Sequence, residues 1–136
     1  MNTLTLGRLR LWPFIGITLL SFCVAAGIGR ERKPFAFNFS FATTDIVTSL
    51  GKVAHYESTA LILLFATFAL GHRKLRAAFI LTMLVCAGWE LAEATAADHT
   101  ARLADLAPDL VSATATLVVI ALVRYLLRFR NLTGLE

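Results

Sequence analysis

A chain of 136 residues that is 57% apolar, with its apolar residues in long blocks, is not patterned like one small soluble domain. Its net charge of +4 forms no basic stripe away from the ends of these blocks, which argues against nucleic-acid binding. A helix of about 20 apolar residues spans the hydrocarbon core of a bilayer, where free backbone groups find no water. The blocks therefore predict an all-α membrane protein that forms a single domain over residues 1–136.

Four apolar blocks are long enough to cross a bilayer as helices. The first follows Arg8 and Arg10 and could be mistaken for a signal peptide. Its apolar stretch is longer than a usual signal core and no Ala-x-Ala-like cleavage site follows it, so we expect a retained helix. The predicted spans lie at about residues 11–29, 53–70, 75–97 and 106–125, with a long connection at 30–52.

The Lys and Arg residues are distributed unequally across this four-helix topology. The two termini and the connection between the second and third spans carry eight of the thirteen basic residues, and the opposite side carries five. Because cytoplasmic loops are enriched in Lys and Arg, we expect both termini to lie in the cytoplasm. The opposite side, which carries the connection at residues 30–52, is called the outer side below.

The connection at residues 30–52 contains the sequence PFAFNFSF, in which Phe alternates with small or polar residues. An extended chain with this period places all of its rings on one side. The rings either lie against acyl chains at the membrane interface or contact a neighbouring protein. Thr44 or Asp45 is expected to cap a helix that runs through Gly51 into the second span. The four aromatic residues are Phe35, Phe37, Phe39 and Phe41.

Five of the nine acidic residues lie between Trp89 and Leu110, where the third span ends and the fourth begins. Glu90 and Glu93 are three residues apart, so they share one face of the third span. The second span begins on the same outer side. The polar residues that share a face at the start of the second and fourth spans are Lys52, His55, Tyr56 and Thr59, and Asp109, Ser112 and Thr116.

These polar residues are expected to gather at the outer boundary, because a charged side chain at the bilayer centre costs about 2.5 to 3.5 kcal/mol. We expect the carboxylates to face Lys52, His55 and Arg102. Such a cluster either clasps the helices together or forms a site for a headgroup, an ion or a substrate. The predicted outer polar cluster consists of Lys52, His55, Glu90, Glu93, Arg102, Asp105 and Asp109.

The sequence contains no recognisable catalytic motif. It has no His-Glu-x-x-His, no Ser-x-Gly-type nucleophile and no Gly-rich phosphate loop, so we expect no catalytic residues. Glu90, Glu93 and His99 match a metal-ligand set only weakly, and neither a metal nor a cofactor is expected. Cys23 and Cys86 lie within predicted helices, where small packing residues are expected rather than a disulfide.

The polar residues also follow a pattern in chain order. Lys-x-x-His opens one span, in KVAH, and Glu-x-x-Glu lies near the end of the next, in ELAE. Arg-x-x-Asp-x-x-x-Asp-Leu opens the last span, in RLADLAPDL. Over residues 45–125 this pattern resembles the VanZ-like family of small membrane proteins. The residues that carry the resemblance are Lys52, His55, Glu90, Glu93, Arg102, Asp105 and Asp109.

The resemblance implies a multi-pass protein of the bacterial inner membrane with a polar outer pocket. Members of the family are linked to low-level resistance to the glycopeptide teicoplanin, and the resemblance supplies no reaction. Two functions stay open. In one, the chain is a non-catalytic accessory or assembly subunit whose partners are the bilayer and other subunits of an envelope, photosynthetic or respiratory complex. In the other, it binds or modifies a lipid-linked envelope precursor, with Lys52 and Arg102 recognising phosphate.

Overall fold

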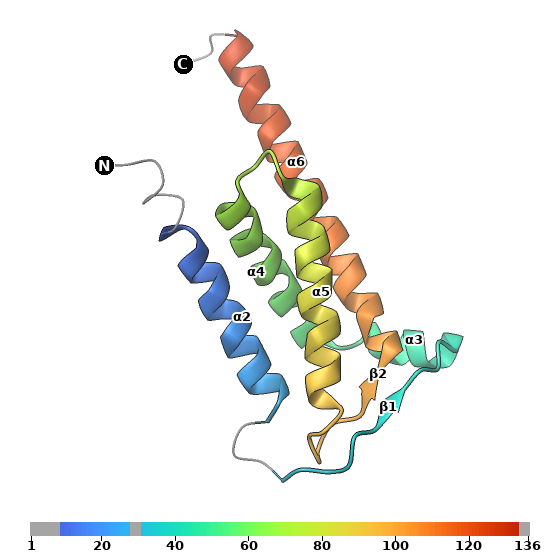
Figure 1. Ribbon diagram of the computed structural model, residues 1–136. Coiled ribbons are helices and arrows are strands. Elements are labelled where there is room, and N and C mark those ends of the chain that lie inside the picture. The colour runs from blue at the N-terminus through green and yellow to red at the C-terminus, as the bar shows by residue number, and fades with distance from the viewer. Residues whose placement is uncertain (1–8, 28–30, 134–136) are drawn as a thin grey trace.

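The computed structural model describes residues 9–27 and 31–133, with side chains described as far as Arg130. Within these ranges the chain is mainly helical, and two short strands and one 3₁₀ helix lie together at one end (Figure 1). The elements in chain order are α2 (Leu11–Ala25), β1 (Phe37–Asn38), α3 (Thr43–Ser49), α4 (Val53–Leu70), α5 (Leu75–Glu93), β2 (Ala101–Arg102), η1 (Leu103–Asp105) and α6 (Leu106–Thr133).

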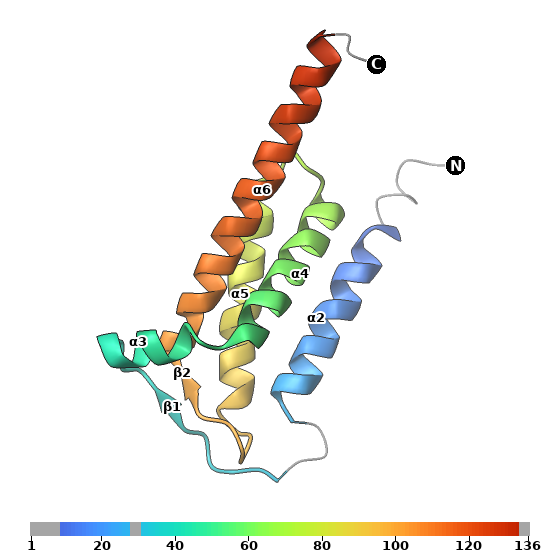
Figure 2. The ribbon, with the colours of Figure 1, turned by 180° about the vertical axis from the view of Figure 1, so that it is seen from behind.

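Four helices, α2, α4, α5 and α6, run side by side along the length of the molecule (Figures 1 and 2). The central helix is α4, which packs against the other three. The core between α4, α5 and α6 consists largely of small residues, Ala66, Ala78 and Ala113, packed around Leu63. Small side chains let helix backbones approach closely, which favours association of helices in lipid, where no hydrophobic driving force acts between them.

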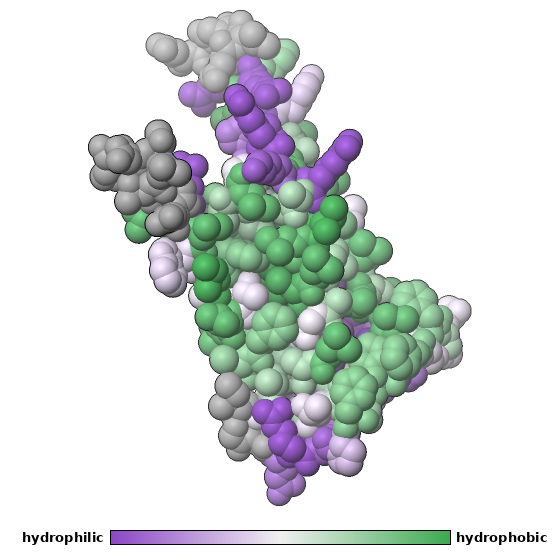
Figure 3. All heavy atoms as spheres, viewed as in Figure 1, coloured by the Kyte–Doolittle hydropathy of each residue, from purple (hydrophilic) through white to green (hydrophobic). Residues whose placement is uncertain are grey.

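The outside of the bundle is apolar between two polar ends. Leu64, Leu84 and Val118 are among the large apolar side chains that remain exposed on α4, α5 and α6. Figure 3 shows this apolar band, with hydrophilic residues gathered at both ends of the molecule. The helices α4 and α5 and the segment Leu103–Arg130 are each long and apolar enough to cross a membrane. The chain therefore has the surface of a membrane protein whose sides contact lipid, as the sequence predicted.

The helix in the first predicted span is shorter than expected. It has 15 residues, or about 22 Å of helix, against about 30 Å of hydrocarbon core. Gly27, at φ 58°, adopts the left-handed conformation that commonly ends a helix, and its N–H bonds to the carbonyl of Val24. Residues 28–30, which include the predicted end of this span, lie outside the described residues. Four spans were predicted, and the part of the chain that the structure describes contains three helices of spanning length.

The helices of the third and fourth predicted spans end at different places from those expected. The third ends at Glu93 rather than at residue 97, because the backbone of residues 94–97 pairs with the segment 31–36 instead of continuing α5. The fourth continues to Thr133, about two turns beyond residue 125. Its added residues are rich in Leu and Arg, which are good helix formers, and those described are exposed.

The Phe-rich connection is extended, as predicted, and its backbone is hydrogen-bonded to the loop that follows α5. Its strand β1 pairs in parallel with β2, with Phe37 opposite Ala101 and Asn38 opposite Arg102. The rings of Phe37 and Phe39 lie together, with their centroids 4.8 Å apart. Phe37 is partly covered, whereas the other three rings are exposed, in the case of Phe39 to 73%. The pairing was not predicted because β2 is only two residues long and carries no strand pattern.

The prediction of one helix running through Gly51 into the second span is wrong. Two separate helices, α3 and α4, occupy this stretch, and α3 projects sideways from the base of the bundle (Figures 1 and 2). The break occurs because Lys52 adopts an extended conformation with ψ 90°. The change of direction brings the end of α3 against η1 and the start of α6.

The predicted cap of α3 is also wrong. The N-cap position is Ala42, so Thr44 and Asp45 lie in the first turn of the helix. The hydroxyl of Ser40 accepts the backbone N–H of Ala42 at 3.3 Å and donates to the carboxylate of Asp45 at 2.7 Å. These bonds fix the path by which the Phe-rich connection enters α3.

Candidate functional site

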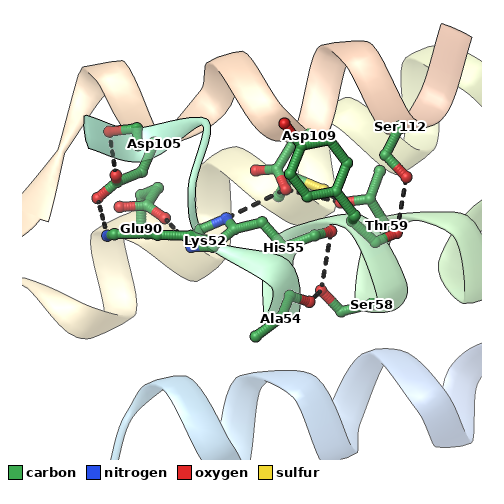
Figure 4. A network of polar contacts seen from close by, with 12 residues as sticks. Lys52, Ala54, His55, Ser58, Thr59, Glu90, Asp105, Asp109 and Ser112 are labelled. Carbon is green, nitrogen blue, oxygen red and sulfur yellow. Dashed lines mark hydrogen bonds and ion pairs between the residues drawn. The ribbon is translucent and has the colours of Figure 1, made fainter. Parts of the chain in front are cut away.

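The outer end of the bundle, where α4 begins, α5 ends and α6 begins, contains a network of buried polar side chains (Figure 4). Its first part joins Lys52 to Asp105. The ammonium nitrogen of Lys52 lies 2.7 Å from Asp105 Oδ2, and the hydroxyl of Ser49 donates to Asp105 Oδ1 at 2.6 Å. Asp105 is fully buried in η1, and both of its carboxylate oxygens therefore have partners.

The second part of the network is centred on His55 in the first turn of α4. Its Nδ1 atom lies 3.1 Å from Asp109 Oδ1 on α6, and the hydroxyl of Thr59 donates to the same oxygen at 2.7 Å. The indole of Trp89, on α5, stacks on the imidazole with the planes 10° apart. Because a carboxylate accepts hydrogen bonds, Nδ1 carries the proton that faces Asp109. The ring is therefore oriented by both its stacking and its hydrogen bond.

Glu90, on α5, faces the other nitrogen of the imidazole. Its side chain is 1% exposed, and its Oε1 atom lies 3.9 Å from His55 Nε2. The second oxygen, Oε2, accepts the backbone N–H of Arg102 at 3.3 Å. Oε1 has no hydrogen-bond partner among the residues that the structure describes. A buried carboxylate oxygen without a partner is costly, so it marks a place where a further group would be stabilised.

The contacts of the network join every helix end at the outer boundary except that of α2. Lys52 and Asp105 link the start of α4 to η1, and His55 and Asp109 link α4 to α6. A further bond between α6 and α4 runs from the hydroxyl of Ser112 to the carbonyl of Tyr56, at 2.6 Å. Removing one member of a buried ion pair leaves the other charge without a partner, which is strongly destabilising. The network therefore links α4, η1 and α6 at the outer end of the bundle.

The structure brings five residues of the predicted outer polar cluster into this network and leaves two at its edge. Glu93 is buried, and its Oε2 atom lies 3.8 Å from Nδ1 of His99. The guanidinium of Arg102 lies 3.9 Å from Asp45 on α3, so only the backbone N–H of this residue reaches Glu90. This differs from the expectation that the carboxylates of the cluster face Arg102 as well as Lys52 and His55. In β2 the side chain and the N–H point in different directions.

Three residues of the network were not expected from the sequence: Ser49, Cys86 and Trp89. The Sγ atom of Cys86 lies 3.4 Å from the Thr59 hydroxyl, inside the bundle. Positions 86, 89, 90 and 93 form one stripe of a helix, so the face shared by the two glutamates could have indicated Cys86 and Trp89. Ser49 has no such signal, because its position depends on the break between α3 and α4.

A pocket of about 540 Å³ opens beside the network, between α2, α4, α5 and the loop that follows α5. Its volume lies within the range of small-molecule sites. His55 and Trp89 line it, so it reaches the network directly. Glu93 and Asp98 also line it, whereas the ammonium of Lys52 is already bound to a carboxylate. His99 lines the pocket too, within 3.9 Å of both acids, so the charges at the pocket wall have partners and do not select between a cation and the phosphate that the sequence led us to expect.

Three buried side chains in the network have the composition of a metal site. His55, Glu90 and Asp109 each offer one ligand atom, and these atoms all lie within 4.8 Å of one another. Imidazole and carboxylate groups are common ligands of first-row divalent metals. The set considered from the sequence, with Glu93 and His99, shares only Glu90 with this group.

Comparisons with known proteins found no match to any family model, any curated protein or any solved structure.

Proposed function

We propose that the chain is a VanZ-like, non-catalytic membrane protein that serves as an accessory or assembly subunit of a larger complex in a bacterial inner membrane. The observation that carries the proposal is the outer segment at residues 31–42. Backbone pairing fixes this segment to the bundle, yet it leaves Phe35, Phe39 and Phe41 exposed. A fixed aromatic surface is a feature of protein contacts, in which rigid rings supply much of the buried area.

The outer segment is held along most of its length. The backbone N–H of Lys33 bonds to the carbonyl of Thr95, and the N–H of Ala36 bonds to that of Ala94, both at 3.0 Å. The side chain of Lys33 also donates to the carbonyl of His99. These bonds fix the segment within the chain itself. Binding of a partner therefore loses little free energy to ordering of the segment.

The chemistry of the surface favours a protein over acyl chains. Between the exposed rings lie the exposed polar residues Asn38 and Ser40, and α3 adds the exposed pair Thr44 and Val47. Acyl chains offer no hydrogen-bonding groups, whereas protein interfaces combine aromatic residues with hydrogen-bonding ones. The partner that fits is a membrane subunit with an apolar helix face and polar groups at the height of the outer interface.

The topology that accompanies this function has four spans and cytoplasmic termini. In it α2 lies in the first span, and the inner end carries the larger share of Lys and Arg. Single cysteines introduced at Asn38 and at His72, in a chain without Cys23 and Cys86, test this arrangement. A membrane-impermeant thiol reagent added to intact cells is expected to label position 38 and not position 72. Labelling at position 72 and not at position 38 would show the opposite orientation, with the Phe-rich connection in the cytoplasm.

A photoreactive phenylalanine analogue at position 39 tests the proposed contact. The matched control places the same analogue at Leu84, an apolar residue on α5 that is 65% exposed and lies away from the outer segment. After irradiation of native membranes, we expect position 39 to yield one covalent product with a single membrane subunit, and Leu84 to yield lipid adducts. The same subunit should migrate with the chain in fixed ratio after extraction in mild detergent.

Two results would overturn the proposal. One is lipid adducts alone at position 39, which would place the rings against acyl chains. The other is migration of the chain alone, as a monomer or homodimer, from membranes that contain all of its native neighbours.

A second function is favoured by the outer pocket: binding or modification of a lipid-linked envelope precursor. A pocket of about 540 Å³ between membrane helices is large enough for part of an amphiphile. Native mass spectrometry of the chain released from lipid nanodiscs is expected, in this case, to show one retained envelope lipid. Replacing Ala54, which lines the pocket, with Trp should displace it. If the Ala54→Trp variant retains the lipid, the pocket is not the site at which the lipid binds.

A further inference from the structure

We propose that His55 and Glu90 bind a divalent first-row transition-metal ion between α4 and α5, and that Asp109 orients the imidazole for this purpose. The site is separate from the aromatic surface, so it does not depend on the proposed accessory function. It rests on two independent observations, which are the grouping of three potential ligand residues and the unpartnered oxygen of Glu90 directed at the imidazole.

The Nε2 atom of His55 and the Oε1 atom of Glu90 face each other inside the bundle. With the Nδ1 proton directed at Asp109, the neutral form of the ring presents the lone pair of Nε2 on the side of Glu90. Glu90 Oε1, also an acceptor, lies 3.9 Å from it, which is too far for a hydrogen bond. In this form two acceptors face each other in a buried site, and their repulsion is relieved either by a proton on one of them or by a metal cation between them.

The separation of these two atoms suits a metal ion bound between them. Zinc lies about 2.0 to 2.2 Å from histidine nitrogen and carboxylate oxygen ligands. An ion between Nε2 and Oε1, which are 3.9 Å apart, can therefore contact both atoms without a change in the backbone. Neither atom has to lose a described hydrogen bond to make room, because Oε1 has none and Nε2 faces away from Asp109.

The groups around His55 hold its imidazole in one orientation. A metal-binding histidine usually donates its other N–H to a carboxylate, which fixes the ring and raises the basicity of the ligand nitrogen. Asp109 occupies that position, and it is itself held by the Thr59 hydroxyl at 2.7 Å. The stacked indole of Trp89 limits rotation of the ring from the other side. The arrangement is therefore a supported ligand site and not a chance approach of two side chains.

The buried carboxylates around His55 favour a bound cation, and the outer pocket gives water access to it. Glu90 and Asp109 bring two carboxylates into a buried volume in which Lys52 is bound to Asp105. A divalent cation would offset this excess of negative charge, which lipid and apolar helices cannot do. His55 lines the outer pocket, so water from the pocket can fill the remaining coordination positions. A ligand set of one imidazole, one carboxylate and water suits Zn²⁺, Mn²⁺ or Fe²⁺ and is unlike the all-oxygen sites of Ca²⁺.

The test uses the full chain in mild detergent, stripped with chelator and dialysed against Zn²⁺ or Mn²⁺. Metal per chain is measured by inductively coupled plasma mass spectrometry, with about one ion per chain expected for a single site. Glu90→Gln keeps the shape of the side chain and should abolish binding. Asp109→Asn should weaken binding about 10- to 100-fold, because it removes the group that orients the imidazole. Glu57→Gln, an exposed carboxylate two residues from His55, is the matched control and should bind normally.

Two outcomes of the binding measurement would overturn the proposal. The wild-type chain could take up no metal, which would leave protonation of His55 or of Glu90 as the way in which the repulsion between them is relieved. Binding could also survive in Glu90→Gln, which would show that the metal lies at adventitious surface groups. If Glu90→Gln does not fold, Co²⁺ bound to the wild-type chain decides the question. Visible ligand-field bands typical of nitrogen and oxygen ligands support the site, and their absence at saturating Co²⁺ overturns it.

Discussion

Both ends of the bundle carry charged side chains, but these are buried and paired at the outer end and mostly exposed at the inner end. At the outer end the carboxylates of Glu90, Asp105 and Asp109 are buried, each within reach of groups from other elements. At the inner end the basic side chains are mostly exposed and line a hollow of about 890 Å³. The charged residues that line this hollow are Arg73, Lys74, Arg76, Arg124 and Arg128.

The length of the side chains explains the difference. Lys and Arg have long apolar stems, so from a helix end they reach water without a protein partner. Asp and Glu are short, and inside the bundle they must be paired or neutralised. Arg124 illustrates the inner arrangement, since it donates to the backbone carbonyl of His72 at 2.7 Å and not to a buried acid. The outer acids are therefore buried and paired with other elements, whereas the inner basic residues are mostly exposed.

The largest effect is expected from Asp109→Ala at the outer end. The substitution removes the acceptor of both His55 and Thr59 and leaves buried polar groups without a partner. We expect a loss of about 3 to 5 kcal/mol in the free energy of unfolding, which is typical of breaking a buried charged pair. The measurement is titration with dodecyl sulfate in mild detergent, with chelator present so that metal loss does not contribute.

The control for Asp109→Ala is Glu57→Ala, which removes an exposed carboxylate from α4. Its cost should stay within about 0.5 kcal/mol, as for other surface substitutions. Equal costs for the two variants would show that the buried network does not hold α4 against α6.

A smaller effect is expected from Lys52→Met, which keeps the apolar stem but removes the ammonium from Asp105. Lys52 is partly exposed, so the pair is worth less than a fully buried one, and we expect a loss of about 2 kcal/mol. A double-mutant cycle with Asp105→Asn measures the interaction itself. If Lys52→Met costs as much in the Asp105→Asn background as alone, the ion pair contributes nothing.

The smallest effect is expected from Arg128→Gln at the inner end. Its side chain is exposed, so the free energy of unfolding should change by no more than about 0.5 kcal/mol in the same titration. A loss as large as that of Lys52→Met would remove the distinction between the two ends, and would mean that the basic residues also hold the helices together.

The bounds of α4 agree with the sequence-based prediction, and those of α5 do not. An apolar run flanked by Lys52 and Gly71 is enough to predict a helix at residues 53–70, because local hydrogen bonds and lipid both favour it. The end of α5 depends on a segment about 60 residues earlier in the chain, whose backbone competes for Ala94 and Ala96. No local pattern reports such long-range pairing, since each contributing strand is one or two residues long.

In the candidate site, too, some features could be predicted from local sequence and others depend on how the helices pack. Helical spacing and the shared membrane side were enough to group His55, Glu90 and Asp109 in one cluster, because spacing determines the height and the helix face of each side chain. Spacing does not determine how neighbouring helices rotate and approach one another. Those quantities decided that Asp109 binds the imidazole, that Arg102 faces Asp45, and that one oxygen of Glu90 is left without a partner.

The sequence by itself thus determined that the chain is a helical membrane protein and that its acidic residues gather at one end. Both follow from local and additive quantities, which are the length of the apolar blocks and the positions of charges along them. Only the tertiary structure decided which charges pair, where the aromatic segment is fixed and how the outer pocket is formed. These depend on contacts between elements far apart in the chain, and such contacts are set by packing rather than by spacing.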